Sequence, residues 1–259
     1  MPDISLTTVV LLCVAALVAG WIDAVVGGGG LLMLPALLLG LPQVPAAQIL
    51  GTSKAVAIVG TSGAAVTYVR KAPVQVKTAV RIGLAALAGS MGGAFFAAGI
   101  SSDVLRPVIM VVLVGVAAFV MLRPSFGTQG EDKAPVGRGR IVTAIVLVGG
   151  GIGFYDGLIG PGTGTFLVLA LTAVLHLDLV NASATAKIVN VCTNAGALAM
   201  FAYQGSVLWQ LAAVLAVFNL AGGMVGARMA LSKGAEFVRG VLLFVVFSLV
   251  AKLAFDQWA

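Results

Sequence analysis

Long apolar stretches separated by short polar breaks dominate the pattern of this 259-residue chain. Most of them approach or exceed the ~20 residues that a helix needs to cross about 30 Å of hydrocarbon, and only the second and seventh are clearly shorter. They show no sustained two-residue alternation, so they predict membrane-spanning helices rather than the strands of an outer-membrane barrel. The ten stretches cover residues 4–26, 31–41, 46–69, 74–100, 104–122, 141–159, 165–180, 182–203, 207–231 and 237–255.

The second half of the chain repeats the first at a constant spacing. Asp23 and the glycines after it return as Asp156 and a second glycine cluster, at an offset of 133 residues (156 − 23 = 133). Internal repeats in a very apolar chain are typical of transporters built from two related halves. Further pairs at this offset are Gly20 and Gly153, Thr52 and Thr185, Lys54 and Lys187, Gly89 and Gly222, and Met91 and Met224.

The composition places the chain in a bilayer. Apolar residues make up 60% and charged residues 9% of the sequence, and mean hydropathy is +1.12. A water-soluble protein has a charged share nearer about 25%, which excludes that class. Cys13 and Cys192 both lie inside apolar stretches, so the sequence predicts no disulfide, metal site or cofactor. No basic leader precedes the first stretch, so we expect the first helix to be retained rather than cleaved.

Basic residues gather at three polar breaks, whereas the breaks near residues 42–45, 101–102 and 204–205 contain no Lys or Arg. The positive-inside rule predicts that the basic breaks are cytoplasmic and that both chain termini lie outside. The net charge of +6 then belongs mainly to a face beside anionic lipid and calls for no nucleic-acid partner. The basic residues are Arg70, Lys71 and Lys77; Arg123, Lys133, Arg138 and Arg140; and Arg228, Lys233 and Arg239.

The sequence therefore predicts an all-α, polytopic membrane protein of two homologous repeats with four to five transmembrane segments each. Residues 1–123 form the first repeat, 124–139 a cytoplasmic linker and 140–259 the second repeat. Five crossings in each half make the repeats inverted, whereas parallel halves would put the third basic break on the wrong side. Whether the short segments 31–41 and 165–180 fully span is left open.

Each half carries a glycine cluster between its first two apolar stretches. Glycine favours backbone conformations that helices exclude, and Pro161 lacks a backbone donor, so each cluster predicts a helix that breaks and restarts. The first N–H groups of a restarted helix lack intrahelical partners, and two such starts facing one cavity would attract an anion. Tight bends or close helix contact are the alternative, which two equivalent clusters beside acids disfavour. The candidate binding residues are Gly27, Gly28, Gly29, Gly30, Gly160, Gly162, Thr163, Gly164 and Thr165.

Two lysines lie inside apolar stretches. Lys54 lies about eight residues after position 46, and Lys187 about five after position 182. A bare ammonium at such depth costs several kcal/mol, so we expect a functional role; snorkelling to the interface is the alternative and suits Lys187 better. Lys187, Asn190 and Asn194 share one helix face through their i, i+3, i+7 spacing, and such a polar stripe suits an oxyanion. The candidate substrate-binding residues on these helices are Thr52, Ser53, Lys54, Lys187, Asn190 and Asn194.

Asp23 and Asp156 each precede a glycine cluster by a few residues. A carboxylate there could pair with a lysine, orient the broken backbone, or gain and lose a proton during transport. An interfacial carboxylate near a helix end is an equal alternative. The sequence does not separate a coupling role from a structural one.

Small residues recur every fourth position in two further stretches, at Gly89, Gly93 and Ala97 and again at Gly222, Gly226 and Ala230. Such stripes let helix backbones approach closely in lipid. They predict helix packing rather than a binding site.

The motifs around both glycine clusters resemble the TauE/SafE family of sulfite exporters and sulfonate permeases. The resemblance rests on GWIDAVVGGGG at 20–30 and GTSK at 51–54, and in the second half on GFYDGLIGPGTGTF at 153–166 and ATAK at 184–187, followed by Asn190. It runs over nearly the whole chain and implies a bacterial inner-membrane carrier of small sulfur-containing or carboxylated anions. It chooses neither the anion, the direction of transport nor the coupling ion, for which protons are one candidate.

A secondary carrier that works by alternating access around a central site is the leading functional hypothesis. An anion channel of the same fold is the main alternative, together with a carrier of a carboxylate, or of a cation held by Asp23 and Asp156. An enzyme is disfavoured, because the apolar stretches assemble no Ser/His, Asp-pair or metal constellation and the chain has no nucleotide-binding motif. The sequence leaves homodimer formation open.

Overall fold

The computed structural model describes residues 5–72, 74–122 and 137–258, and the regular elements in these ranges are all helical. The first half contains α1 (Leu6–Val26), α2 (Gly29–Gly40), α3 (Ala46–Val69), α4 (Val76–Ala98) and α5 (Ser102–Leu122). The second half contains α6 (Arg138–Thr143), the π-helix η1 (Ala144–Ile152), α7 (Gly153–Leu158), α8 (Thr163–Leu175), α9 (Leu179–Tyr203) and α10 (Trp209–Trp258). The predicted all-α fold class is confirmed.

Five helical runs in the described residues are long and apolar enough to cross a membrane. They are Leu6–Val26, Ala46–Val69, Val76–Ala98, Arg138–Leu158 and Trp209–Gly234. The apolar helices α2 and α8, which follow the glycine clusters, have only 12 and 13 residues. At 1.5 Å per residue they reach roughly 20 Å, short of the ~30 Å hydrocarbon core. The chain is therefore a multi-pass helical membrane protein, with two shorter apolar helices among its long ones.

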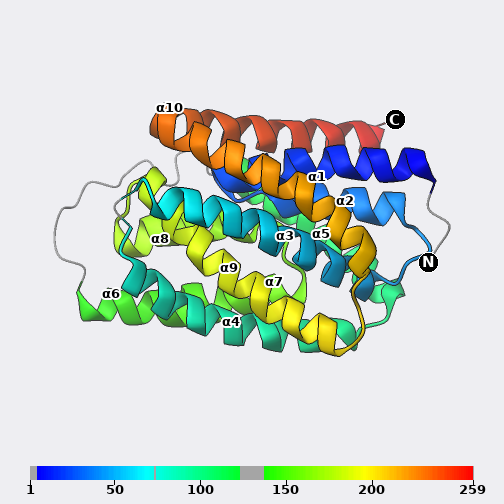
Figure 1. The fold of residues 1–259 in the computed structure, drawn as a ribbon, viewed down its shortest axis with the longest axis horizontal. Helices are drawn as coiled ribbons and strands as arrows, with labels where there is room; N and C mark the ends of the chain where they lie inside the picture. Colours follow the sequence, from blue (N-terminus) through cyan, green and yellow to red (C-terminus); the bar gives the residue numbers. More distant parts are fainter. Residues whose placement is uncertain (1–4, 73, 123–136, 259) are drawn as a thin grey trace.

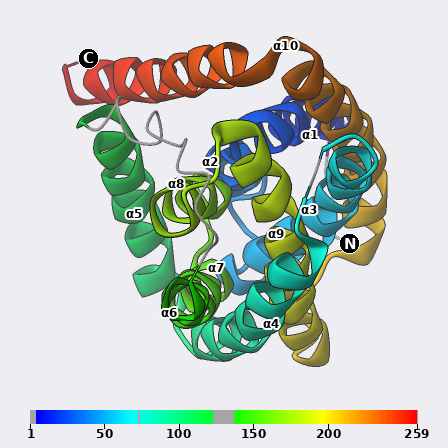
Figure 2. The same cartoon turned by 90° about the vertical axis from the view of Figure 1, so that its left-hand side faces the viewer.

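The helices run roughly along the long axis of the molecule (Figure 1). Seen from one end, α2 and α8 lie toward the middle, and α4, α5, α6 and α10 lie around them (Figure 2). The end of α3, the start of α6 and the bend in α10 all lie at the left-hand end in Figure 1. The basic residues of these three places therefore gather at one end of the molecule, as the charge pattern predicts.

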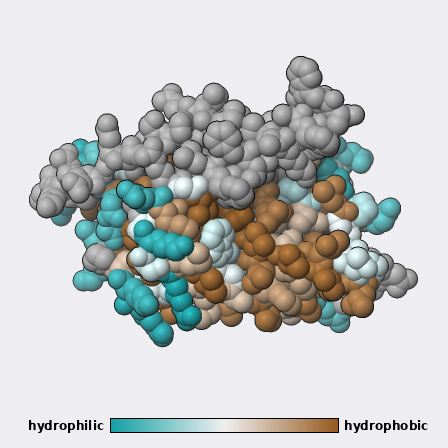
Figure 3. Space-filling model, turned by 90° about the horizontal axis from the view of Figure 1, so that it is seen from above, coloured by the Kyte–Doolittle hydropathy of each residue, from teal (hydrophilic) through white to brown (hydrophobic). Residues whose placement is uncertain are grey.

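A band of apolar side chains surrounds the bundle. Large apolar residues such as Leu11, Val66, Phe96 and Val217 are 51–65% exposed. Figure 3 shows a broad hydrophobic surface, with hydrophilic residues gathered mainly toward the left-hand end. Exposed apolar surface of this extent suits contact with lipid rather than water.

The fourth helical segment of each half packs against the first helical segment of the other half, where α6, η1 and α7 count as one segment. α4 lies against η1 and α7, and α10 lies against α1. A Cβ on Gly93 would lie 2.0 Å from the carbonyl oxygen of Phe154, and one on Gly226 would lie 2.6 Å from that of Trp21. Both contacts follow the 133-residue offset (226 − 93 = 133; 154 − 21 = 133). Close packing by the small-residue stripes is confirmed, and it interlocks the two halves.

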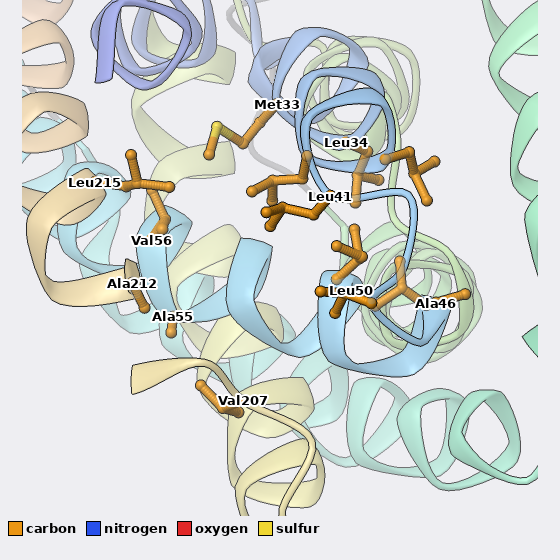
Figure 4. Close-up of a cluster of buried hydrophobic side chains, with 14 of the residues drawn as sticks. Met33, Leu34, Leu41, Ala46, Leu50, Ala55, Val56, Val207, Ala212 and Leu215 are labelled. Carbon is orange, nitrogen blue, oxygen red and sulfur yellow. The ribbon is translucent and has the colours of Figure 1, made fainter. Parts of the chain in front are cut away.

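The largest buried apolar cluster holds α2 in place. Met33 and Leu34 of α2 pack toward Leu50 and Val56 of α3 and toward Leu215 of α10 (Figure 4). Each of these five side chains is at most 5% exposed. This packing fixes the short helix α2 beside the part of α3 that carries Lys54.

One helix boundary differs clearly from the sequence-based expectation. α9 begins at Leu179 rather than at position 182, because the Asp178 carboxylate accepts hydrogen bonds from the backbone N–H groups of Val180 and Asn181, both at 3.0 Å. α10 is interrupted at Gly234, where φ of 74° and ψ of −165° are not helical, and this break lies between the last two predicted stretches. Most of the predicted linker, 124–139, lies outside the described residues.

Candidate functional site

Both glycine clusters break a helix and start another, as predicted. α1 ends at Val26, and Gly27 then adopts a left-handed conformation with φ of 78° while its N–H donates to the carbonyl of Asp23 at 2.8 Å. In the second half, Gly160 and Gly162 have φ values of 85° and 77°, and α8 begins immediately afterwards. Only glycine adopts these conformations at little cost, so the breaks follow directly from the local sequence.

The two breaks touch each other. The Thr165 N–H donates to the carbonyl of Gly27 at 3.2 Å, and the Thr165 hydroxyl donates to that of Val26 at 2.9 Å. A Cβ on Gly27 would lie 2.1 Å from the carbonyl carbon of Gly164. The start of α8 is thus held against the end of α1 by direct backbone contact between the two halves.

Several donors expected to face a substrate are already engaged. The Thr163 hydroxyl donates to the carbonyl of Gly160 at 2.9 Å. The hydroxyl and N–H of Thr165 donate to the carbonyls of Val26 and Gly27, as described above. The Thr52 hydroxyl accepts from the backbone N–H of Leu208 at 3.0 Å. In this conformation these hydroxyls hold the framework of the site, and Thr163 also lines the cavity.

Two buried ion pairs link the halves. Lys54 Nζ lies 2.8 Å from Asp156 Oδ1, and Lys187 Nζ lies 2.9 Å from Asp23 Oδ2. Each lysine pairs with the aspartate of the other half, so the two pairs are related by the same 133-residue offset (187 − 54 = 133; 156 − 23 = 133). The sequence repeat therefore appears again in the contacts at the centre of the molecule.

The lysines lie at equal depth in their helices. Because α9 starts at Leu179, Lys187 follows the first residue of its helix by eight positions, as Lys54 follows Ala46 in α3. Eight residues correspond to about 12 Å of helix. Lys187 is 0% and Lys54 6% exposed, so snorkelling is wrong for both side chains. Their charges are instead compensated by buried carboxylates.

The two aspartates have unequal surroundings. Asp23 Oδ2 also accepts from the Thr61 hydroxyl at 3.3 Å, and Lys187 additionally donates to the Asp23 backbone carbonyl. Among the described residues, Asp156 Oδ2 is buried without a hydrogen-bond partner. The Asp156 side chain is 3% exposed and that of Asp23 16%. One carboxylate thus keeps an unused acceptor oxygen in a nearly dry environment.

A small cavity of ≈ 40 Å³ lies between the breaks, with both aspartates and Lys54 in its wall. Ser53, Asn190 and Asn194 add polar groups from α3 and α9. Six of the candidate binding residues predicted from the sequence do not line it, namely Gly28, Gly29, Thr52, Gly162, Thr165 and Lys187. The full lining is Asp23, Gly27, Gly30, Leu34, Leu50, Ser53, Lys54, Ala57, Asp156, Ile159, Gly160, Thr163, Gly164, Asn190 and Asn194.

Two members of the predicted polar stripe on α9, Asn190 and Asn194, line the cavity together, whereas Lys187 does not line it. The Thr193 hydroxyl donates to Asn190 Oδ1 at 3.0 Å, and Asn194 Nδ2 donates to the same oxygen at 3.4 Å. The polar residue of α3 that is equivalent to Asn194 was not among the candidates predicted from the sequence. Thr61 stands seven residues after Lys54, and it corresponds to Asn194 at the repeat offset (194 − 61 = 133). Shifting Asn194 by the 133-residue repeat offset would have identified Thr61 as a candidate.

The positive and negative charges in the site balance each other. Two ammonium groups and two carboxylates sum to zero, and the described residues contain no group of three or more His, Cys, Asp or Glu side chains that could hold a metal ion. Each ammonium is compensated by one carboxylate, and Lys54 also lines the cavity.

Known proteins resemble this chain over almost its full length. The chain matches the family described as Sulfite exporter TauE/SafE over residues 12–253. The probable membrane transporter protein ORF9 of Sinorhizobium sp is 32% identical over 256 residues, 99% of this chain and 96% of that protein. The probable membrane transporter protein YfcA of Escherichia coli (strain K12) is 32% identical over 242 residues, 93% of this chain and 88% of that protein. No solved structure matches significantly.

The family match includes both glycine clusters, both lysines and both aspartates, since all lie between residues 12 and 253. It confirms the resemblance seen in the motifs of residues 20–30 and 153–166. The relatives named above are probable membrane transporters, in agreement with the apolar helical bundle and its buried charges. The chain belongs to the sulfite exporter TauE/SafE family of membrane transporters.

Proposed function

We propose that this chain is a secondary transporter of small anions of the sulfite or organosulfonate type, and that the substrate binds at the cavity between the two helix breaks. The observation that carries the proposal is the pair of buried ion pairs between halves, Lys54 with Asp156 and Lys187 with Asp23. Ionisable groups inside a membrane are costly and mark transport pathways. The family assignment supports an anion as the substrate.

Charge balance favours a proton as the coupling ion. The ion pairs sum to zero, so a monoanion entering alone would leave one uncompensated charge in a poorly solvated site, at a cost of several kcal/mol. A proton that enters with the anion restores neutrality. We assign this proton to Asp156, because its buried Oδ2 has no hydrogen-bond partner among the described residues. Protonated Asp156 would release Lys54 to bind the anion.

The interlocked pairs favour alternating access. Each lysine and its aspartate belong to different halves, so a movement of one half against the other changes both ion pairs together. A cavity of ≈ 40 Å³ is far below the ~300 Å³ lower range of ligand pockets, so the site is closed here and has to open for an anion to enter. A carrier of two inverted repeats meets this requirement, whereas an anion channel needs a continuous open path.

Orientation follows from the charges. Arg70, Lys71 and Arg228 line one common cavity, so the proposal puts the end of α3 and the part of α10 just before Gly234 on the same side of the membrane. The proposal places this side in the cytoplasm of a bacterial inner membrane, with both termini outside.

Transport into proteoliposomes tests the proposal. Purified protein should accumulate at least one of sulfite, sulfate, taurine, sulfoacetate or a small carboxylate against its gradient when an inward proton gradient is imposed. Lys54→Gln and Lys187→Gln should each abolish uptake, whereas Lys77→Gln, which removes an exposed charge at the start of α4, should not. Anion flux that only follows the anion gradient would indicate a channel. Undiminished uptake by the double variant Lys54→Gln/Lys187→Gln would show that the lysines do not bind the substrate.

A further inference from the structure

A second, larger cavity lies on the outside of the bundle. It has a volume of ≈ 690 Å³ and runs along α3 from Ile58 to Lys71, with Leu220, Met224 and Arg228 of α10 forming its other wall. α3 and α10 lie side by side in Figure 2, and the two helices are in extensive contact. We call this feature the α3–α10 groove. None of its lining residues lines the central cavity, so it is separate from the proposed transport site.

The groove forms where α3 presents small side chains. Ser62, Gly63 and Thr67 line it on α3, and a Cβ on Gly63 would already lie 2.3 Å from Leu220 Cδ1. Val66 in its wall is 51% exposed. Both walls belong to helical runs that are long and apolar enough to span a membrane. The apolar part of the groove therefore faces hydrocarbon rather than water.

One end of the groove is cationic. Arg70, Lys71 and Arg228 line it there, and none of its lining residues is acidic. Within the part of the chain that the structure describes, no ion pair engages any of these three exposed side chains. Two cations from the turn after α3 and one from α10 thus converge on one apolar groove, and none of them has an ion-pair partner among the described residues.

The dimensions match a lipid. Ile58 and Arg70 are twelve residues apart, or about 18 Å along a helix, close to the ~15 Å thickness of one hydrocarbon leaflet. Basic pockets between transmembrane helices are typical binding sites for anionic headgroups. We propose that the α3–α10 groove binds an anionic phospholipid, with an acyl chain along Ile58, Ser62 and Val66 and the headgroup phosphate held by Arg70, Lys71 and Arg228.

Lipid titration of delipidated protein, followed by native mass spectrometry, tests this site. We expect phosphatidylglycerol to bind more tightly than phosphatidylcholine with the same acyl chains. Each basic residue near an anionic headgroup contributes roughly fivefold, so Arg70→Gln/Arg228→Gln should weaken phosphatidylglycerol binding by about 25-fold. Lys77→Gln/Arg138→Gln makes the same change in net charge at the same end of the molecule, outside the groove, and should leave binding within about twofold.

An uncharged variant separates the groove from general surface charge. Ser62→Phe fills its apolar part and should weaken the binding of phosphatidylglycerol while every basic residue remains. Equal binding of the two lipids, or equal loss in both double variants, would overturn the proposal. So would displacement of phosphatidylglycerol by millimolar sulfate that depends on Arg70 and Arg228, because the groove would then be a vestibule for small anions.

Discussion

Replacing Lys54 by glutamine should destabilise the protein more than the same change at Lys187, because the two lysines leave different carboxylates behind. Asp156 is 3% exposed, and Lys54 is its ion-pair partner at 2.8 Å. Its second oxygen has no hydrogen-bond partner among the described residues. Asp23 is 16% exposed and keeps the Thr61 hydroxyl at 3.3 Å. Losing Lys54 therefore leaves the less compensated charge.

The size of the effect follows from the cost of an unpaired buried charge. Removing one partner of a buried ion pair costs about 3–5 kcal/mol in free energy of unfolding, and we assign this value to Lys54→Gln. A hydrogen bond to a charged group is worth about 1.5–3 kcal/mol, so the retained Thr61 contact should make Lys187→Gln less costly by a similar amount. For a chain of this size each kcal/mol lowers Tm by about 2–4 °C, which predicts a loss of roughly 6–20 °C for Lys54→Gln.

Thermal unfolding of the purified protein in detergent, with a double-mutant cycle, provides the measurement. Lys54→Gln/Asp156→Asn removes both charges and should recover most of the stability lost by Lys54→Gln, while transport stays absent. The reasoning is refuted if the double variant is as unstable as the single one. It is also refuted if Lys187→Gln is the more destabilised of the two lysine variants.

Three further predictions concern the helix breaks and the coupling ion. Gly27→Ala should lower Tm and expression, because its φ is 78° and the new Cβ would lie 2.1 Å from backbone, whereas Gly30→Ala meets nothing closer than 3.5 Å and should be tolerated in the same thermal assay. Thr165→Val should cost about 1 kcal/mol in thermal unfolding through its lost hydroxyl bond to α1; an unchanged Tm would remove that role. Asp156→Asn should make any residual anion flux in proteoliposomes independent of the proton gradient, and retained proton coupling would discard Asp156 as the proton carrier.

Most of the helical architecture could be predicted from the sequence, because a chain that crosses hydrocarbon has to pair its backbone N–H and C=O groups internally. Runs such as 46–69 have to be helical to satisfy their backbone groups, and α3 has those bounds. The start of α9 was placed three residues late because Asp178, a polar residue at the edge of an apolar run, acts as the helix cap. Local hydrogen bonding of this kind does not show in a hydropathy pattern.

The candidate site could be predicted in composition but not in pairing. Lys54, Lys187, Asp23 and Asp156 stand out because buried charges are rare in membranes. Which lysine meets which aspartate depends on how the halves pack together, and the contacts that decide it, such as Thr165 with Gly27, join residues far apart in the chain. The same packing turns the hydroxyl and N–H of Thr165 toward the backbone at the end of α1.

The interlocking of the halves also constrains how such a chain could have originated. Among the described residues, the ion-pair partner of Lys54 lies in the other half, and the surface of α4 at Gly93 is covered by the backbone of Phe154. A lone ancestor of half this length would therefore have had an unmatched ammonium and an unfilled helix surface. It would have needed a second copy of itself to be stable, so gene fusion would have joined partners that were already obligate.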